Sequence, residues 1–133
     1  NLDEAIAKHA EWKTKFRKAI AGKEKLDAGT IARDDCCELG KWLHGEARAR
    51  LGALLAYRDC LSNHAKFHTE AGKVASAINA GKYVEAEGML AAGTTYSVAS
   101  GAVGGALVRL KKEAAAVGQP RSRSVLRLIL PVL

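Results

Sequence analysis

The chain has few aromatic residues, few prolines and no long apolar run. Aromatic residues make up 5% of its 133 residues, and only two residues are proline, whereas hydrophobic residues reach 48% and alanine dominates them. Abundant Ala, Leu, Lys and Glu with so little proline favour helices. No stretch of 18 or more apolar residues is present, so we expect no membrane contact from this segment. The length suits one domain.

Neither a starting methionine nor a secretory signal is present, since the chain opens with Asn-Leu-Asp-Glu. The missing methionine suggests a segment of a longer protein. Three cysteines are an odd number, and without a secretory signal we do not expect disulfides. A cytoplasmic, reducing setting is predicted instead.

The net charge of +7 is not concentrated in one stretch, because basic and acidic residues alternate along the predicted helices. Such alternation indicates a solvated surface rather than a nucleic-acid-binding face. No aromatic residues are interleaved with a basic stripe, as single-strand binding would require. The sequence also lacks a glycine-rich phosphate loop and a nucleophile elbow, so no nucleic-acid partner and no enzymatic activity are predicted.

Apolar residues recur at three- and four-residue steps, which predicts long helices over residues 2–21, 46–79 and 82–117. Gly22 and the segment 79–81 supply stop signals. The intervening part is predicted to be irregular, with a short helix carrying Cys36 to Leu43 and capped by Asp34 or Asp35. The predicted fold is all-α: an antiparallel four-helix bundle over residues 1–117 with a short additional helix or loop carrying the cysteine motif.

Two further segments stand apart from this helical pattern. Residues 97–106 are rich in glycine, alanine and serine, which either lets another helix approach closely or kinks the helix there. After residue 117 the composition changes, and residues 118–133 are interpreted as a C-terminal extension or linker without an assigned function.

Three histidines and one cysteine have the pattern of a single metal site. His9 falls on the apolar face of the first predicted helix, and His64 and His68 lie four residues apart on that of the long central one. Buried imidazole rings are costly unless they are satisfied, and a thiolate from Cys37 would favour Zn²⁺ over Mg²⁺, Ca²⁺ or Mn²⁺, although copper is also compatible. Four protein ligands complete a tetrahedral zinc site, which leaves no position for a substrate.

Residues around these four have simpler interpretations. Gly40 permits a turn or close packing, and Trp12 and Trp42 either exclude water from the site or belong to the core. His44 is expected to be a surface residue. The other two cysteines differ in their expected roles. Cys60 is predicted to be a small buried residue, and Cys36 to point away from the ligand set, with an alternative ligand or a thiol that reacts with oxidised Cys37 as its second interpretation.

With these motifs, residues 3–112 resemble the chemoreceptor zinc-binding (CZB) domain family. The resemblance rests on the segments 9–13, 37–43 and 64–68, which read His-Ala-Glu-Trp-Lys, Cys-Glu-Leu-Gly-Lys-Trp-Leu and His-Ala-Lys-Phe-His. It implies zinc ligation by His9, Cys37, His64 and His68 in a helical bundle that is often homodimeric. Members of the family are attached to bacterial chemoreceptors and to diguanylate cyclases.

The resemblance therefore implies a zinc-binding regulatory sensor domain of a bacterial signalling protein, first a cytoplasmic chemoreceptor acting in chemotaxis. Its input would be zinc itself or an oxidant such as hypochlorous acid, which would react with the zinc-bound thiolate. The alternatives are a structural zinc site in a dimerisation module and the regulatory domain of a diguanylate cyclase. A catalytic zinc is disfavoured, because it needs an open coordination position and a nearby general base.

Overall fold

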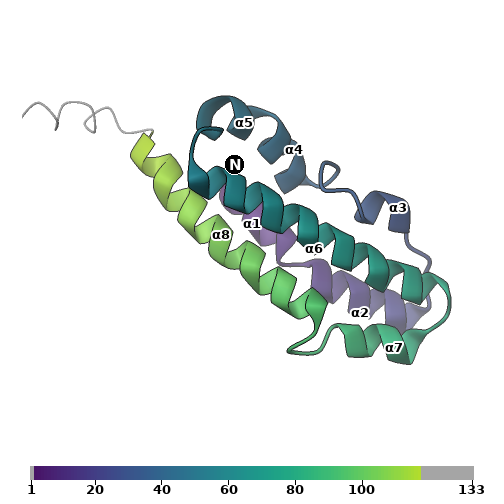
Figure 1. The fold of residues 1–133 in the computed structure, drawn as a ribbon. Coiled ribbons are helices and arrows are strands. Elements are labelled where there is room, and N and C mark those ends of the chain that lie inside the picture. Colours follow the sequence, from purple (N-terminus) through teal and green to yellow (C-terminus); the bar gives the residue numbers. More distant parts are fainter. Residues whose placement is uncertain (1, 118–133) are drawn as a thin grey trace, which may run out of the picture.

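The computed structural model describes residues 2–117, which form a bundle built from α-helices (Figure 1). The helices are α1 (Leu2–His9), α2 (Trp12–Gly22), α3 (Ala28–Ile31), α4 (Glu38–His44), α5 (Glu46–Leu51), α6 (Leu55–Asn79), α7 (Tyr83–Met89) and α8 (Thr95–Val117). The predicted all-α class is confirmed. None of these helices is both long and apolar enough to cross a membrane.

The long helix α6 is the centre of the bundle, and α8 packs along it in the opposite direction (Figure 1). Helices α1 and α2 follow one another along a second side of α6, and the short helices α3, α4 and α5 line a third side. Helix α7 closes the end of the bundle beside α2 and α6. The bundle is thus antiparallel, and the segment that carries the cysteine motif supplies its fourth side.

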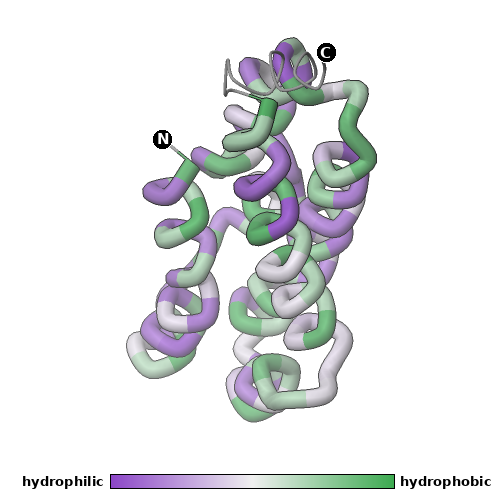
Figure 2. The backbone as a smooth tube through the Cα atoms, turned by 90° about the vertical axis from the view of Figure 1, so that its left-hand side faces the viewer, coloured by the Kyte–Doolittle hydropathy of each residue, from purple (hydrophilic) through white to green (hydrophobic). Residues whose placement is uncertain are grey.

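Hydrophobic and hydrophilic residues alternate in short steps along the helices, as amphipathic packing requires (Figure 2). The side chains that fill the core come from every side of the bundle. The largest fully buried ones are Phe16, Leu39, Leu43, Leu51, Phe67, Ile78, Leu90 and Leu110. His64 and His68 are equally inaccessible, so the core of this bundle contains polar rings.

Each of the three long predicted helices is interrupted once. The break at residues 90–94 has a clear local cause: Gly93 takes a positive φ of 85°, and Thr94 Oγ1 accepts a hydrogen bond from the Ser97 amide at 3.2 Å, which starts α8. The break before α6 follows from Leu54, whose backbone is extended. Residues 10–11 contain neither glycine nor proline, so we attribute the break between α1 and α2 to tertiary packing.

The small residues of 97–106 do not kink α8, and Ala99 and Ala106 among them are buried in the bundle, where α8 packs along α6. Helix α8 runs without interruption from Thr95 to Val117. A Cβ atom built on Gly101 or Gly104 would have no other atom within 4 Å. Within the described residues the predicted kink is therefore wrong, the predicted close approach of another helix is supported by the buried Ala99 and Ala106, and the glycines lie on an open face of α8.

The cysteine-motif segment is capped differently from the prediction. Asp27 caps α3, because its Oδ1 accepts a hydrogen bond from the Thr30 amide at 3.2 Å. Helix α4 is capped by Cys37 itself and not by Asp34 or Asp35. The stop signals are confirmed, since α2 ends at Gly22 and α6 ends at Asn79. The predicted extension, residues 118–133, lies outside the described residues.

Candidate metal centre

Helix α6 brings two of the predicted ligands together by its periodicity alone. His64 and His68 are one turn apart on its buried face, and their ring centroids are 4.5 Å apart. The two Nε2 atoms lie 3.1 Å from one another. Both rings are inaccessible to solvent, with exposed fractions of 0% and 1%. Two imidazoles thus present nitrogen atoms to one small volume in the core.

His9, the last residue of α1, approaches the same volume from across the bundle. Its ring packs on Phe67 at a centroid distance of 4.5 Å and lies 5.2 Å from His64 and 5.8 Å from His68. One nitrogen from each of the three histidines falls within 4.8 Å of the others. The Nε2 atom of His9 is buried and has no hydrogen-bond partner in the described part of the chain.

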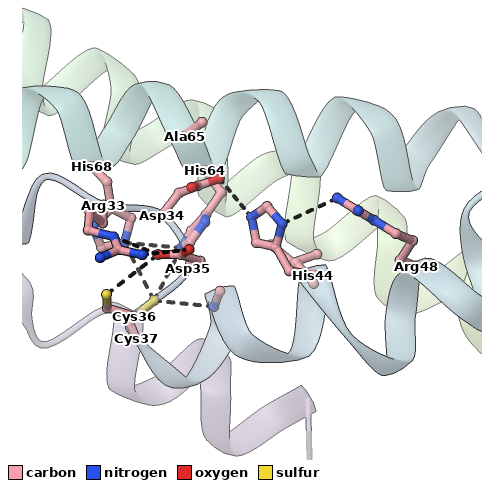
Figure 3. A network of polar contacts seen from close by, with 12 residues as sticks. Arg33, Asp34, Asp35, Cys36, Cys37, His44, Arg48, His64, Ala65 and His68 are labelled. Carbon is pink, nitrogen blue, oxygen red and sulfur yellow. Dashed lines mark hydrogen bonds and ion pairs between the residues drawn. The ribbon is translucent and has the colours of Figure 1, made fainter. Parts of the chain in front are cut away.

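Cys37 adds a sulfur atom from the N-terminal end of α4. Its Sγ lies 3.3 Å from Nε2 of His64 and 3.5 Å from Nε2 of His68 (Figure 3). The same sulfur accepts a hydrogen bond from the backbone amide of Gly40 at 3.3 Å. Cys37 therefore both faces the histidines and caps the helix that follows it.

The position of Cys37 depends on close packing at Gly40. A Cβ atom at residue 40 would overlap the carbonyl oxygen of Asp34, so only glycine lets α4 lie against the preceding loop. The predicted close packing at Gly40 is confirmed. Because Gly40 also donates to Cys37 Sγ, one residue determines both the path of the loop and the orientation of the sulfur.

A backbone contact fixes the tautomer of His68. Its Nδ1 lies 2.7 Å from the carbonyl oxygen of Ile31, which can only accept, so Nδ1 carries the proton and Nε2 has a free lone pair. Helix α3 reaches this position because it packs tightly on α6: a Cβ at Gly72 would lie 2.7 Å from the Cβ of Ala32. A hydrogen bond of this kind to the distal nitrogen is typical of metal-binding histidines.

Burial sets the charge state of these groups. Burial lowers the pKa of His9 to about 4 and that of His64 to about 3, with neighbouring histidines adding to both shifts, and it also lowers the pKa of His68. Neutral imidazoles with free lone pairs are the form that binds metals. Burial raises the pKa of the Cys37 thiol, and amide hydrogen bonds from Gly40 and Leu39 oppose this rise.

Three of the four predicted donors, on Cys37, His64 and His68, have the spacing that a small tetrahedral ion requires, whereas the donor atoms that all lie within 4.8 Å of one another are those of the three histidines, without Cys37. With Zn–N bonds of about 2.0–2.1 Å and a Zn–S bond of about 2.3 Å, a regular tetrahedron places two nitrogens about 3.3 Å apart and a nitrogen about 3.6 Å from the sulfur. The contacts among Cys37, His64 and His68 span 3.1 to 3.5 Å. Without a cation these three polar atoms hydrogen-bond to one another, and a cation at their centre would take the place of those contacts.

Neighbouring residues depart in part from their predicted roles. Trp12 stands edge-on to His68 at 5.8 Å, whereas Trp42 lines a groove between α1 and α4 beside the bundle surface. Cys60 is fully buried, as predicted. His44 is half-buried rather than a simple surface residue: its Nε2 donates to Asp34 Oδ2 at 2.9 Å, and its Nδ1 accepts from Arg48 at 3.3 Å (Figure 3).

Two supporting contacts could not be predicted from sequence patterns. The hydrogen bond between Asp34 and His44 ties the loop before Cys37 to the end of α4. Ile31 makes its contact through its backbone carbonyl, so its side chain gives no indication of it. Only the acidic pair at 34–35 beside a nearby histidine hinted at the first contact, and nothing in the sequence indicated the second.

The family model of the chemoreceptor zinc-binding domain (CZB) matches residues 9–75, which is half of the chain and includes all four predicted ligands. The chain therefore belongs to the CZB family, a family of zinc-binding regulatory sensor domains. Comparison with curated protein sequences and with solved structures found no match. The buried histidine cluster provides a candidate metal site within the matched region.

Proposed function

We propose that this chain is the zinc-binding regulatory domain of a bacterial signalling protein, with Zn²⁺ held by His9, Cys37, His64 and His68. The observation that carries the proposal is the approach of Cys37 Sγ to the Nε2 atoms of two fully buried histidines at 3.3 and 3.5 Å. Four protein donors close the coordination shell, which supports sensing or structure over catalysis.

Bound zinc would keep the Cys37 sulfur deprotonated and join three separate elements, α1, the start of α4, and α6. Hydrogen bonds of two of these ligands link the site to α4 and α3 as well. Cys37 caps α4 through the Gly40 amide, and His68 holds α3 through the Ile31 carbonyl. Displacement of the Cys37 sulfur would therefore remove a metal ligand and a helix cap in one event.

The proposed input is either zinc availability or oxidation of the Cys37 sulfur by an oxidant such as hypochlorous acid. A pocket of about 280 Å³ between α1 and the Cys37 segment gives small molecules a route to the site, since both His9 and Cys37 line it. The proposed output domain is a cytoplasmic chemoreceptor, and the alternative is a diguanylate cyclase.

We further propose that the domain works as a homodimer through the open face of α8. This face exposes Val98 and Val108 to 64% and 65%, with Gly101 and Gly105 between them. Each glycine inside a helix costs about 1 kcal/mol relative to alanine, and the chain itself makes no use of their small size. Packing against α8 of a second copy would offset that cost.

A chelator titration distinguishes a sensor from a structural zinc site. The domain is mixed with zinc and a competing chelator of known affinity, while helix content and zinc occupancy are followed together. Reversible loss and return of zinc at a moderate chelator concentration supports sensing. Zinc that leaves only when the domain is denatured would instead support the structural alternative, a zinc site that only stabilises a dimerisation module.

A further inference from the structure

A second cysteine lies directly beside the candidate ligand and outside the ligand set. Cys36 precedes Cys37 in a bend between α3 and α4, and its side chain is half-exposed. Its thiol donates to Asp35 Oδ1 at 3.5 Å, and Asp35 in turn accepts two hydrogen bonds of 3.1 Å from Arg33 (Figure 3). Cys36 is therefore held near the site without facing the histidines.

Both cysteines open into the same spaces. The pocket of about 280 Å³ that gives access to the site is lined by Cys36 and Cys37 together. A second pocket, of about 100 Å³, is also lined by both, along with Trp12 and His68. A small oxidant that reaches the sulfur of Cys37 through either pocket thus finds the Cys36 thiol in the same space.

The third cysteine lacks these properties. Cys60 is 0% exposed within the core, and burial raises the pKa of its thiol to about 11. A buried, protonated thiol is a poor nucleophile and lies out of reach of oxidants. Of the three cysteines, only Cys36 and Cys37 are therefore both reachable by a small oxidant and next to one another.

We propose that Cys36 is the resolving thiol of the zinc site, a role that rests on the proposed oxidant input to Cys37. In the first step the Cys37 thiolate donates an electron pair to hypochlorous acid, the O–Cl bond breaks, chloride leaves, and Cys37 becomes a sulfenic acid. In the second step the Cys36 sulfur attacks the Cys37 sulfur, and the hydroxyl group leaves as water with the proton of the Cys36 thiol. The product is a disulfide between residues 36 and 37.

This disulfide has two consequences at the site. It turns the Cys37 sulfur away from His64 and His68, so the metal loses a ligand and α4 loses its cap. The bond is also easily reduced, because adjacent Cα atoms are about 3.8 Å apart whereas unstrained disulfides span about 4.4–6.8 Å. Oxidation is then a reversible signal instead of leading to sulfinic acid.

The sequence provides a direct assay. Trypsin cleaves after Arg33 and Lys41, which releases residues 34–41 with both cysteines, while Cys60 falls in a different peptide. The zinc-loaded domain and the Cys36→Ser variant are treated with two equivalents of hypochlorous acid, because conversion of one sulfur to a sulfinic acid consumes two. The 34–41 peptide is then analysed by mass spectrometry, and released zinc is measured with a chromogenic chelator.

The wild-type peptide should become two hydrogens lighter, and dithiothreitol followed by zinc should restore full zinc binding. Cys36→Ser should bind zinc normally before oxidation, then gain two oxygens on Cys37 and fail to recover. Equal gain of two oxygens in both proteins, or a disulfide between two chains, would overturn the role of Cys36. Failure of Cys36→Ser to bind zinc would also overturn it, whereas zinc retained by the oxidised wild type would overturn the oxidant input itself.

Discussion

His68 Nδ1 and the carbonyl oxygen of Ile31 are 2.7 Å apart, so a ring at the candidate metal centre is hydrogen-bonded to the backbone of α3. A helix of four residues has little stability of its own, and α3 is held mainly by this bond and by its packing on α6. The order of the segment that carries Cys37 should therefore depend on the occupancy of the site.

Zinc removal should loosen one side of the bundle selectively. Without the ion, His68 and Cys37 lose a shared partner, so amide hydrogen exchange should accelerate across residues 28–44. Helix α8, which carries none of the four candidate ligands, serves as the internal control. Hydrogen exchange with mass spectrometry measures both regions in one sample. A uniform acceleration over the whole chain would contradict this selective coupling.

Gly40→Ala should destabilise the fold and weaken zinc binding together. The new methyl group would overlap the Asp34 carbonyl oxygen, and overpacking of this kind costs about 1–3 kcal/mol. The loop must move, which displaces the Cys37 sulfur. Gly88→Ala is the matched control, because a Cβ there meets no atom within 4 Å and alanine should stabilise α7 by up to about 1 kcal/mol. Denaturant unfolding measures the stability of both variants, and zinc titration measures their zinc affinity. A Gly40→Ala variant with the stability and zinc affinity of the wild type would contradict this prediction.

The zinc-free domain should lose stability as the pH falls below about 6.5. Burial lowers the pKa of His9 to about 4 and of His64 to about 3 in the folded state, whereas both titrate near 6.5 when unfolded. Between these values the unfolded chain binds more protons, so acid favours unfolding. From pH 7 to pH 5 each histidine should contribute a loss of about 2 kcal/mol.

Urea unfolding of the zinc-free protein at pH 7 and pH 5 measures this loss, and His64→Gln should reduce it by about 2 kcal/mol, the share of His64. Equal stability of the wild type at the two pH values would show that these rings are not buried in the neutral form.

Charge on the open face of α8 should prevent dimerisation. Val98→Glu and Val108→Glu each place a carboxylate where the second copy would pack, and desolvating it there would be costly. Val84→Glu is the control, because Val84 is 89% exposed on α7, away from that face. Sedimentation equilibrium should show dimers for the wild type and Val84→Glu and monomers for the α8 variants. A monomeric wild type would rule out the dimer.

Most of the fold was predictable from periodicity, because the apolar steps follow the helices that pack on α6. The interruptions of the three long predicted helices were harder to predict from the sequence. Gly93 and Thr94 carry a recognisable signal for the end of one helix and the cap of the next, but residues 10–11 carry none, because tertiary packing determines that break. The role of Cys37 as a cap was also missed, since cysteine is not among the usual capping residues.

The convergence of the candidate ligands followed from the sequence only in part. The spacing of His64 and His68 guarantees their proximity on any helix. The distances from Cys37 and His9 to that pair depend on how three elements pack, which periodicity does not specify. The supporting contacts from Ile31 and Asp34 arise from loop geometry, and one of them involves only a backbone atom.

The most direct test of the proposed zinc site is the metal content of the purified domain beside its Cys37→Ser variant, with Cys60→Ser as the control. The account predicts about one zinc per chain in the wild type and the control. It also predicts a more than about 100-fold loss of zinc affinity in Cys37→Ser, because loss of an outer-shell partner alone costs about 10–100-fold. A wild-type domain that takes up no zinc, or a Cys37→Ser variant that binds it equally well, would contradict the account.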